Sequence, residues 1–503
     1  MTPRRSRFLG NTVALVLSTA IGTALALAQM KILAAALPLA TFGLFASLRG
    51  LSLLVAMLAA NGFPQTLTRY LPEHAARSER AAASRATAGA LTLTALLCAV
   101  LLAAVVAARS VFFDKVPADA LDARFILWFS VTTLAVAIKL VVYGGFNGLR
   151  RFGSQTVFET GTLLAQVVWM ALEADRLTLT RLFEIVGVTS LVAALVATPW
   201  LAGRLRRDVV PASTCAAPAS YRDYWLGAAG LSVVALAFTD ADRWVLSNVL
   251  ALEALSLFHV ASRVSRLANR FIALPVLAFQ PEVTRVASEG RTDVVASSTR
   301  AFFKASVVAS VFAAAAIAVF AGDLILLASN ESFLGARPTL WLLAASIPLS
   351  AMTAPLTAVM KAFDGVRAAL ACDLVWACLY IVLLVTLAGP LGVAGAGVAQ
   401  LAACAAQFTL ASRLASVKPR AREVVSSVAK ALLCAAAAFG PVVVVEIVRA
   451  PRALAWVLAI PAAWFYLRAA RRLRIFTDDE RARLSQALPG LGLATRRLGW
   501  WMP

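Results

Sequence analysis

The feature that most constrains the fold is a succession of long apolar segments that runs along almost the whole chain. Each is about 17 to 25 residues long, which is the length an α-helix needs to cross the hydrocarbon core of a bilayer. Of the 503 residues, 61% are hydrophobic, well above the share in soluble globular domains. Within lipid every backbone polar group has to be bonded inside the protein, which favours helices. The sequence therefore predicts an all-α, polytopic membrane protein.

About fourteen segments are long and apolar enough to span the membrane. They lie at roughly 11–33, 42–67, 88–109, 124–147, 153–172, 182–203, 224–249, 254–279, 301–327, 339–361, 368–388, 391–414, 425–447 and 453–468.

The basic residues of the chain are concentrated in alternate loops. The net charge is +21, and loops such as those at 77–85, 204–207 and 418–422 are rich in arginine or lysine, whereas the loops between them are poorer. This is the pattern of cytoplasmic loops. We therefore expect both termini in the cytoplasm, and we attribute the positive charge to topology rather than to nucleic-acid binding.

Two similar stretches indicate an internal duplication. Phe146–Arg150 closes the fourth segment and Phe363–Arg367 closes the tenth, at an offset of 217 residues (363 − 146). Two six-helix lobes in the same orientation would explain this spacing, with a site at the repeat interface. The predicted domains follow from it: the N-terminal lobe 1–207, a cytoplasmic linker 208–223, the C-terminal lobe 224–416, two additional membrane helices 417–468 and a cytoplasmic amphipathic tail 469–503.

Motifs that carry catalysis are missing from the sequence. It contains no phosphate-binding GxxxxGK[ST], no GxSxG and no HExxH. The two histidines form no zinc motif and the six cysteines form no CxxC pair. We therefore expect neither an enzyme nor a bound metal or cofactor.

Charges inside the apolar segments remain as the functional candidates, and three of them form a stripe. Arg263, Arg266 and Arg270 follow one another at three- and four-residue steps, so a helix places them on one face. A lipid-facing charge at mid-depth costs at least about 2.5 to 3.5 kcal/mol, which favours a protein-lined or wet cavity. Guanidinium groups bind phosphate with two parallel hydrogen bonds, so the stripe favours an anionic ligand such as pyrophosphate.

Four further charges are candidates. Arg49 falls in the outer part of the second segment and Lys139 well inside the fourth, while Asp240 and Asp242 lie in the seventh. Each also has a structural explanation: Asp240 could pair with Arg243 one helical turn away, and Arg49 could reach the interface with its long side chain, as could Arg270.

The chain resembles the polysaccharide flippases of the MATE-like (MOP) superfamily. The resemblance extends over nearly the whole chain and rests on diffuse stretches rather than on one signature. They are Gly50–Glu73, which ends in TRYLPE, Gly145–Phe152, Ala261–Leu267 together with Asp242 and Phe258, Pro281–Glu282 and Pro390–Ala396.

The resemblance implies a V-shaped, two-lobed transporter of the bacterial inner membrane. Its members move undecaprenyl-pyrophosphate-linked oligosaccharides from the cytoplasmic to the periplasmic leaflet through a cationic cavity. Functional basic residues on their second and eighth helices correspond to Arg49 and to Arg263 or Arg266, and a recurring carboxylate corresponds to Asp240 or Asp242. Membrane lipids, polysaccharide polymerases and glycosyltransferases are the expected partners.

Two alternatives share this fold: a flippase for lipid II, the peptidoglycan precursor, and a cation-coupled multidrug exporter. The exporter would be expected to offer carboxylates, whereas the candidate cavity residues here are mainly basic. A membrane-embedded polymerase or ligase would need a large outer loop, which the sequence lacks, and a purely structural role for the buried charges stays open.

Overall fold

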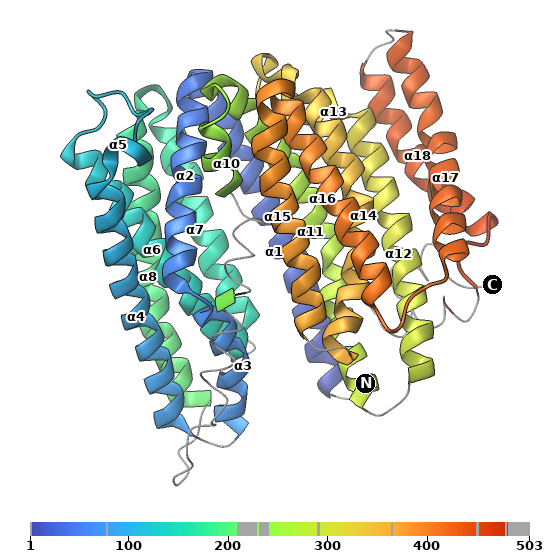
Figure 1. The fold of residues 1–503 in the computed structure, drawn as a ribbon, viewed down its shortest axis with the longest axis horizontal. Coiled ribbons are helices and arrows are strands. Elements are labelled where there is room, and N and C mark those ends of the chain that lie inside the picture. The colour runs from blue at the N-terminus through green and yellow to red at the C-terminus, as the bar shows by residue number, and fades with distance from the viewer. Residues whose placement is uncertain are drawn as a thin grey trace. The chain divides into compact units, whose positions relative to one another are not determined.

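The structure is a computed structural model and it describes residues 3–76, 79–149, 151–208, 229–230, 241–288, 292–363, 366–448, 452–477 and 480. These residues form long helices joined by turns (Figure 1), which confirms the predicted all-α, polytopic membrane fold. In chain order the elements are α1 (Pro3–Ala36), α2 (Leu39–Ala60), α3 (Phe63–Ala76), α4 (Arg80–Ala107), α5 (Arg109–Phe112), α6 (Ala123–Gly148), α7 (Phe152–Leu172), the 3-10 helix η1 (Ala174–Arg176), α8 (Leu179–Asp208), α10 (Ala241–Ser247), α11 (Leu252–Ser288), α12 (Thr292–Val319), α13 (Ala321–Ala328), the 3-10 helix η2 (Glu331–Ala336), α14 (Arg337–Phe363), α15 (Val366–Leu391), α16 (Val393–Leu414), α17 (Ala421–Ile447) and α18 (Arg452–Arg472).

Within the described residues, 11 helices are long and apolar enough to cross a membrane. Each coincides with one of the segments predicted from hydropathy. The three other predicted segments are 153–172, which forms α7, 254–279, which lies inside the longer α11, and 224–249, most of which lies outside the described residues.

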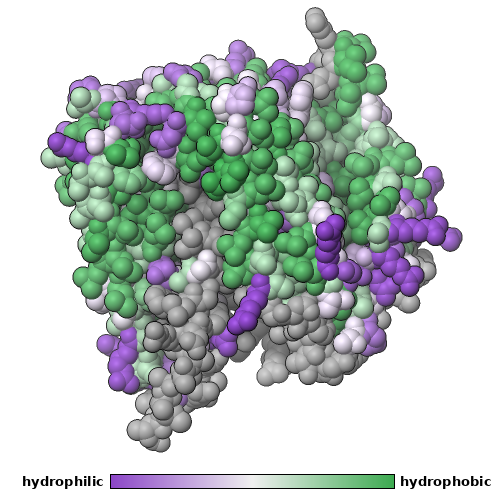
Figure 2. Space-filling view, in the orientation of Figure 1, coloured by the Kyte–Doolittle hydropathy of each residue, from purple (hydrophilic) through white to green (hydrophobic). Residues whose placement is uncertain are grey.

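The chain divides into two compact units. The N-terminal unit comprises Leu17–His259 with Ala328–Ser332, and the C-terminal unit comprises Val260–Leu327 and Phe333–Pro503 with Met1–Val16. Apolar side chains cover much of the surface of the helices, as Figure 2 shows. On α4, for example, Leu96 is 59% and Val100 66% exposed. Such an apolar surface is suited to contact with lipid tails. The predicted domain boundaries stay a prediction.

The second predicted segment is broken in the structure. It was expected to be continuous over 42–67, but α2 ends at Ala60 because Asn61 adopts the left-handed conformation, with φ 38°, and Gly62 follows with φ 79°. Asn and Gly are the residues that tolerate this conformation best. Helix α3 then begins in a new direction at Phe63, so α2 is shorter than predicted.

Helix α3 packs against α6 through two glycines spaced four residues apart. A Cβ atom at Gly144 would lie 2.5 Å from the Cα of Pro64, and one at Gly148 would lie 2.6 Å from the carbonyl oxygen of Leu67. The hydroxyl of Thr68 also donates to the carbonyl of Gly144 at 3.2 Å. Small residues at this spacing let helix backbones approach closely within a membrane.

Polar side chains also join helices inside the N-terminal unit. Gln29 on α1 donates to Gln166 on α7 at 3.2 Å, and Gln166 donates in turn to Thr189 on α8 at 3.1 Å. On α2, Ser47 donates to Ser247 of α10 at 2.9 Å. Such interhelical hydrogen bonds satisfy groups that lipid could not solvate.

In the C-terminal unit, α17 and α18 pack against α12. The hydroxyl of Tyr466 on α18 donates to the carbonyl of Val308 on α12 at 2.8 Å, and Phe320 stacks on Trp456 with ring centroids 4.7 Å apart. Buried side chains from all three helices form one apolar cluster.

After α18, Glu480 is joined to this unit by an ion pair and to Thr477 by two hydrogen bonds. Lys304 on α12 donates to both carboxylate oxygens of Glu480, at 2.8 and 2.9 Å. The same carboxylate accepts from the backbone N–H of Thr477 at 2.9 Å, while the Thr477 hydroxyl accepts from the backbone N–H of Glu480 at 3.3 Å. This reciprocal pair is a capping box.

Candidate functional site

Lys139 is a cation inside a membrane-spanning helix of the N-terminal unit. It lies nine residues (148 − 139) before the end of α6, about 14 Å along the helix axis. The side chain is half-buried, and its ammonium group lies 5.9 Å from the centre of the Tyr143 ring. Within the described ranges Lys139 forms no ion pair.

The charges of Arg49 and Glu159 both act on Lys139. Arg49 is a half-buried residue on α2, and Glu159 is an exposed residue on α7. Three neighbouring helices thus bring two cations and one carboxylate into one electrostatic environment. That Arg49 and Lys139 bind a ligand stays a prediction, and Glu159 is a neighbouring charge that the sequence pattern did not indicate.

Arg49 lies at the middle of its helix rather than toward one end. Ten residues (49 − 39) separate it from the start of α2 and eleven (60 − 49) from the end. The expectation that it lies in the outer part of the segment was wrong, because it assumed a helix that continues to residue 67. The break at Asn61 moves the end of the helix closer to Arg49.

The arginine stripe lies on α11 in the C-terminal unit. Arg263 and Arg266 are half-buried and Arg270 is exposed. The helical spacing that places the three on one face is confirmed, because α11 is continuous over 37 residues. Arg49 and Lys139 belong to the N-terminal unit and the stripe to the C-terminal unit. The five cations are therefore described as two separate groups.

Of the two carboxylate candidates, Asp240 and Asp242, the structure describes only Asp242. Asp240 lies outside the described residues. Asp242 lies in the first turn of α10 and is only 1% exposed, and its neighbour Arg243 is fully buried. Because α10 packs against α2 through Ser47 and Ser247, Asp242 lies in the interior of the N-terminal unit.

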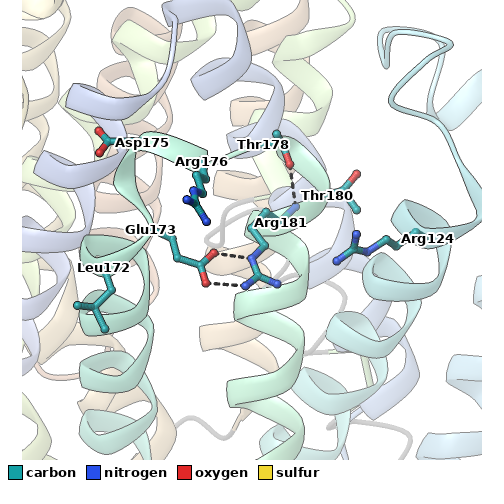
Figure 3. A pocket seen from close by; sticks show the side chains of 8 residues that line it. All are labelled: Arg124, Leu172, Glu173, Asp175, Arg176, Thr178, Thr180 and Arg181. Atoms are coloured by element: carbon teal, nitrogen blue, oxygen red, sulfur yellow. Dashed lines mark hydrogen bonds and ion pairs between the residues drawn. The ribbon is translucent and has the colours of Figure 1, made fainter.

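A second group of charges lies where α7 ends and α8 begins, and Figure 3 shows it. Arg181 donates through Nε and Nη2 to the two oxygens of Glu173, both at 2.5 Å, and its Nη1 lies 2.7 Å from Glu184. Arg124 donates to the other oxygen of Glu184 at 2.7 Å. The Arg181 guanidinium, followed by the Trp169 indole N–H, lowers the pKa of Glu173 to about 2. No group of three His, Cys, Asp or Glu residues that could hold a metal occurs in the described part of the chain.

Comparison with solved structures identifies the class of fold. A structure titled as the lipid II flippase MurJ in an inward closed conformation matches with a TM-score of 0.68 at 11% identity, covering 92% of this chain and 98% of that one. An inward-facing multidrug resistance MATE family transporter matches at 0.62 and 13% identity, over 80% and 97% of the chains. A MOP superfamily transporter from Pyrococcus furiosus matches at 0.58 and 15%, over 81% and 96%. The fold is that of the MOP superfamily transporters.

The sequence itself identifies the family. The model of the family described as polysaccharide biosynthesis protein matches residues 8–286, more than half of the chain. The chain belongs to this family. No curated protein sequence matches it.

Proposed function

We propose that the protein is a flippase that moves an undecaprenyl-pyrophosphate-linked oligosaccharide from the cytoplasmic to the periplasmic leaflet by alternating access. The family and the MOP fold support a transporter or lipid-linked flippase. The observation that carries the finer proposal is the cationic pair of the N-terminal unit, Arg49 and Lys139, inside membrane-spanning helices. Cations held at this depth are suited to a pyrophosphate group that has to leave the interface.

In the proposed mechanism the headgroup enters the protein from the cytoplasmic side of the inner membrane. The proposed headgroup ligands are Arg49 and Lys139 in the N-terminal unit, and Arg263, Arg266 and Arg270 of α11 in the C-terminal unit. Moving one net negative charge outward across a membrane that is negative inside gains about 2.3 kcal/mol per 100 mV, so the membrane potential favours export. Asp240 or Asp242 is the proposed coupling carboxylate if a cation is exchanged. The oligosaccharide reaches the polymerase at the outer leaflet after the glycosyltransferases have assembled it.

The test uses inverted membrane vesicles that contain the native chain or a Lys139→Ala variant at equal amounts. The probe is an undecaprenyl-pyrophosphate-linked oligosaccharide with a radiolabelled sugar, and transport is the fraction that becomes inaccessible to a glycosidase added outside. A charged contact to phosphate contributes about 1.5 to 3 kcal/mol. We therefore expect Lys139→Ala to slow transport about tenfold or more.

Lys115→Ala is the matched control, because Lys115 belongs to the same unit but lies between α5 and α6, outside the membrane-spanning helices. This control is expected to transport at the native rate. Unchanged transport by Lys139→Ala would show that the headgroup binds elsewhere.

A lipid II flippase is the second candidate, and the fold similarity to MurJ over 92% of this chain favours it. The same vesicles distinguish the two functions when they are loaded with labelled lipid II. Transport of lipid II without transport of the oligosaccharide would replace the first proposal with this one. Export of a cationic drug alone would instead support the multidrug exporter.

A further inference from the structure

A polar pocket lies at one end of the N-terminal unit, away from Arg49 and Lys139. It has a volume of about 640 Å³ and is formed where α6 begins, α7 ends and α8 begins (Figure 3). This volume is within the usual range for sites that bind small molecules, about 300 to 1,000 Å³. The pocket has no role in the mechanism proposed above.

Two carboxylates, Glu173 and Asp175, line the pocket, and Glu184 lies beside it on α8; of these three, Glu173 and Glu184 are paired with arginines. Both oxygens of Glu173 accept from Arg181, and both oxygens of Glu184 lie at 2.7 Å from a guanidinium, one from Arg181 and one from Arg124. In Figure 3 the Asp175 carboxylate points away from these pairs. Among these three carboxylates, only Asp175 has no ion pair to a described residue.

Donors are available by contrast. The Arg124 side chain is 60% exposed and uses one nitrogen on Glu184. Arg176 is exposed and points toward the Glu173–Arg181 pair in Figure 3, and it forms no ion pair with any residue in the described ranges. Thr180 also lines the pocket. Guanidinium groups bind carboxylate and phosphate oxygens with two parallel hydrogen bonds.

The pocket lies at the opposite end of α8 from the basic cluster of Arg204, Arg206 and Arg207. Helix α8 has 30 residues and is thus about 45 Å long, enough to cross the bilayer. With the basic end in the cytoplasm, as the positive-inside rule predicts, the pocket faces the periplasm. A ligand would therefore bind to this pocket from the periplasm, the side on which the transported substrate leaves the protein.

We propose that this pocket binds the acidic group of a saccharide, a carboxylate or phosphate carried by a sugar, through Arg124 and Arg176. The inference rests on the proposed function, because the oligosaccharide would reach the pocket as it leaves the transporter. Sugar hydroxyls would add hydrogen bonds to Thr180. A substrate with an acidic sugar would thus be retained at the exit more strongly than a neutral one.

The test measures binding to the purified full-length protein in lipid nanodiscs. The probes are fluorescently labelled trigalacturonate, which carries carboxylates, and equally labelled maltotriose, which is neutral. The native protein is expected to bind trigalacturonate at least tenfold more tightly than maltotriose. The Arg124→Ala, Arg176→Ala double variant is expected to lose this preference.

Arg109→Ala is the matched control, because Arg109 is an exposed arginine of α5 in the same unit that does not line the pocket. It is expected to bind both probes like the native protein. The melting temperature of each variant is measured in the same nanodiscs. A melting temperature of the double variant equal to that of the native protein would exclude misfolding. If it unfolds, Arg176→Ala alone, at an exposed position without an ion pair, is expected to weaken trigalacturonate binding at least threefold.

Three results would overturn the proposal. They are equal affinity for the two trisaccharides, unchanged trigalacturonate binding by both the double and the single variant, and displacement of trigalacturonate by inorganic phosphate at equal concentration, which would show a general anion site. Binding is measured without transport, so it can fail while the native chain still moves the lipid-linked probe. Conversely, acidic-saccharide binding would stand if the transport assay failed.

Discussion

At the scale of residues, the intramembrane charges of the N-terminal unit are of two kinds. Arg243 and Asp242 are 0% and 1% exposed, so their desolvation has to be offset inside the unit. Lys139 and Arg49 are only half-buried. Burial thus distinguishes the first pair, in the interior of the unit, from the second, which is the proposed binding pair.

The charged network at the end of α7 gives a prediction about pH. The pKa of Glu173 in the folded protein, about 2, lies below its usual value because Arg181 holds the ionised form. A lowered folded pKa contributes stability that is fully present above the usual carboxyl pKa of about 4.3 and is lost as the pH falls toward 2. A Glu173→Gln variant is therefore expected to melt below the native protein at pH 6, and the difference should shrink at pH 3.

The measurement is the melting temperature in detergent at several pH values between 3 and 7. Asp175→Asn is the control, because Asp175 is an exposed neighbour with no ion pair among the described residues. A difference between Glu173→Gln and the native chain that stays constant across this range would contradict the assignment.

A candidate site residue could be predicted from the sequence when it is a charged residue within an otherwise apolar segment. Lys139 and the arginines of α11 are cations in apolar helices, so hydropathy alone marks them. Glu159 is likewise a charged residue in an apolar helix. A single carboxylate 13 positions (172 − 159) before the end of α7 does not indicate which helix it faces. Its link to Lys139 depends on the packing of α6 beside α7, which local sequence does not specify.

At the scale of elements, the contact between α3 and α6 depends on two glycines. A side chain at Gly144 would meet the backbone of Pro64, which cannot rotate away as a side chain could. We expect Gly144→Leu to destabilise the N-terminal unit by about 1 to 3 kcal/mol, the usual cost of overpacking, or more if α3 separates from α6.

The readout is thermal unfolding followed by tryptophan fluorescence. Gly161→Leu is the matched control, since a Cβ atom at this position of α7 meets nothing within 4 Å. Equal melting temperatures for the two variants would mean that α3 is free to shift away from α6.

The membrane-spanning elements were largely predictable because hydropathy is a property of the segment itself. The break at Asn61–Gly62 was missed although Asn-Gly is a turn signal, since apolar residues continue on both sides of it. The similar break at Phe320, between α12 and α13, lies in an apolar run with even less local signal. Where a helix bends inside an apolar run is decided by packing.

At the scale of the whole molecule, the charges of the N-terminal unit give a testable orientation. Arg80 donates to the carbonyl of Arg206, so the basic ends of α4 and α8 lie together. At the other end of this unit, Asp119 between α5 and α6 and Glu173 between α7 and α8 are acidic residues near arginines. The positive-inside rule then predicts that this basic end faces the cytoplasm.

Single cysteines placed at the two ends test this orientation in a chain whose own cysteines are replaced. Asp119→Cys and Arg207→Cys are at exposed positions. In intact cells without an outer membrane, an impermeant maleimide is expected to label Asp119→Cys only, and in inverted vesicles Arg207→Cys only. The reverse pattern would invert the proposed direction of transport.

The attachment of the C-terminal segment has a consequence for cooperativity. One carboxylate, that of Glu480, both caps the first turn at Thr477 and pairs with Lys304 on α12. The Glu480 carboxylate takes part in both interactions. The hydrogen bond to Thr477 therefore lowers the free energy of forming the ion pair with Lys304, and the ion pair does the same for the hydrogen bond. The cap at Thr477 and the ion pair with Lys304 are therefore expected to be lost together, and any partner that competes for Glu480 would disrupt both.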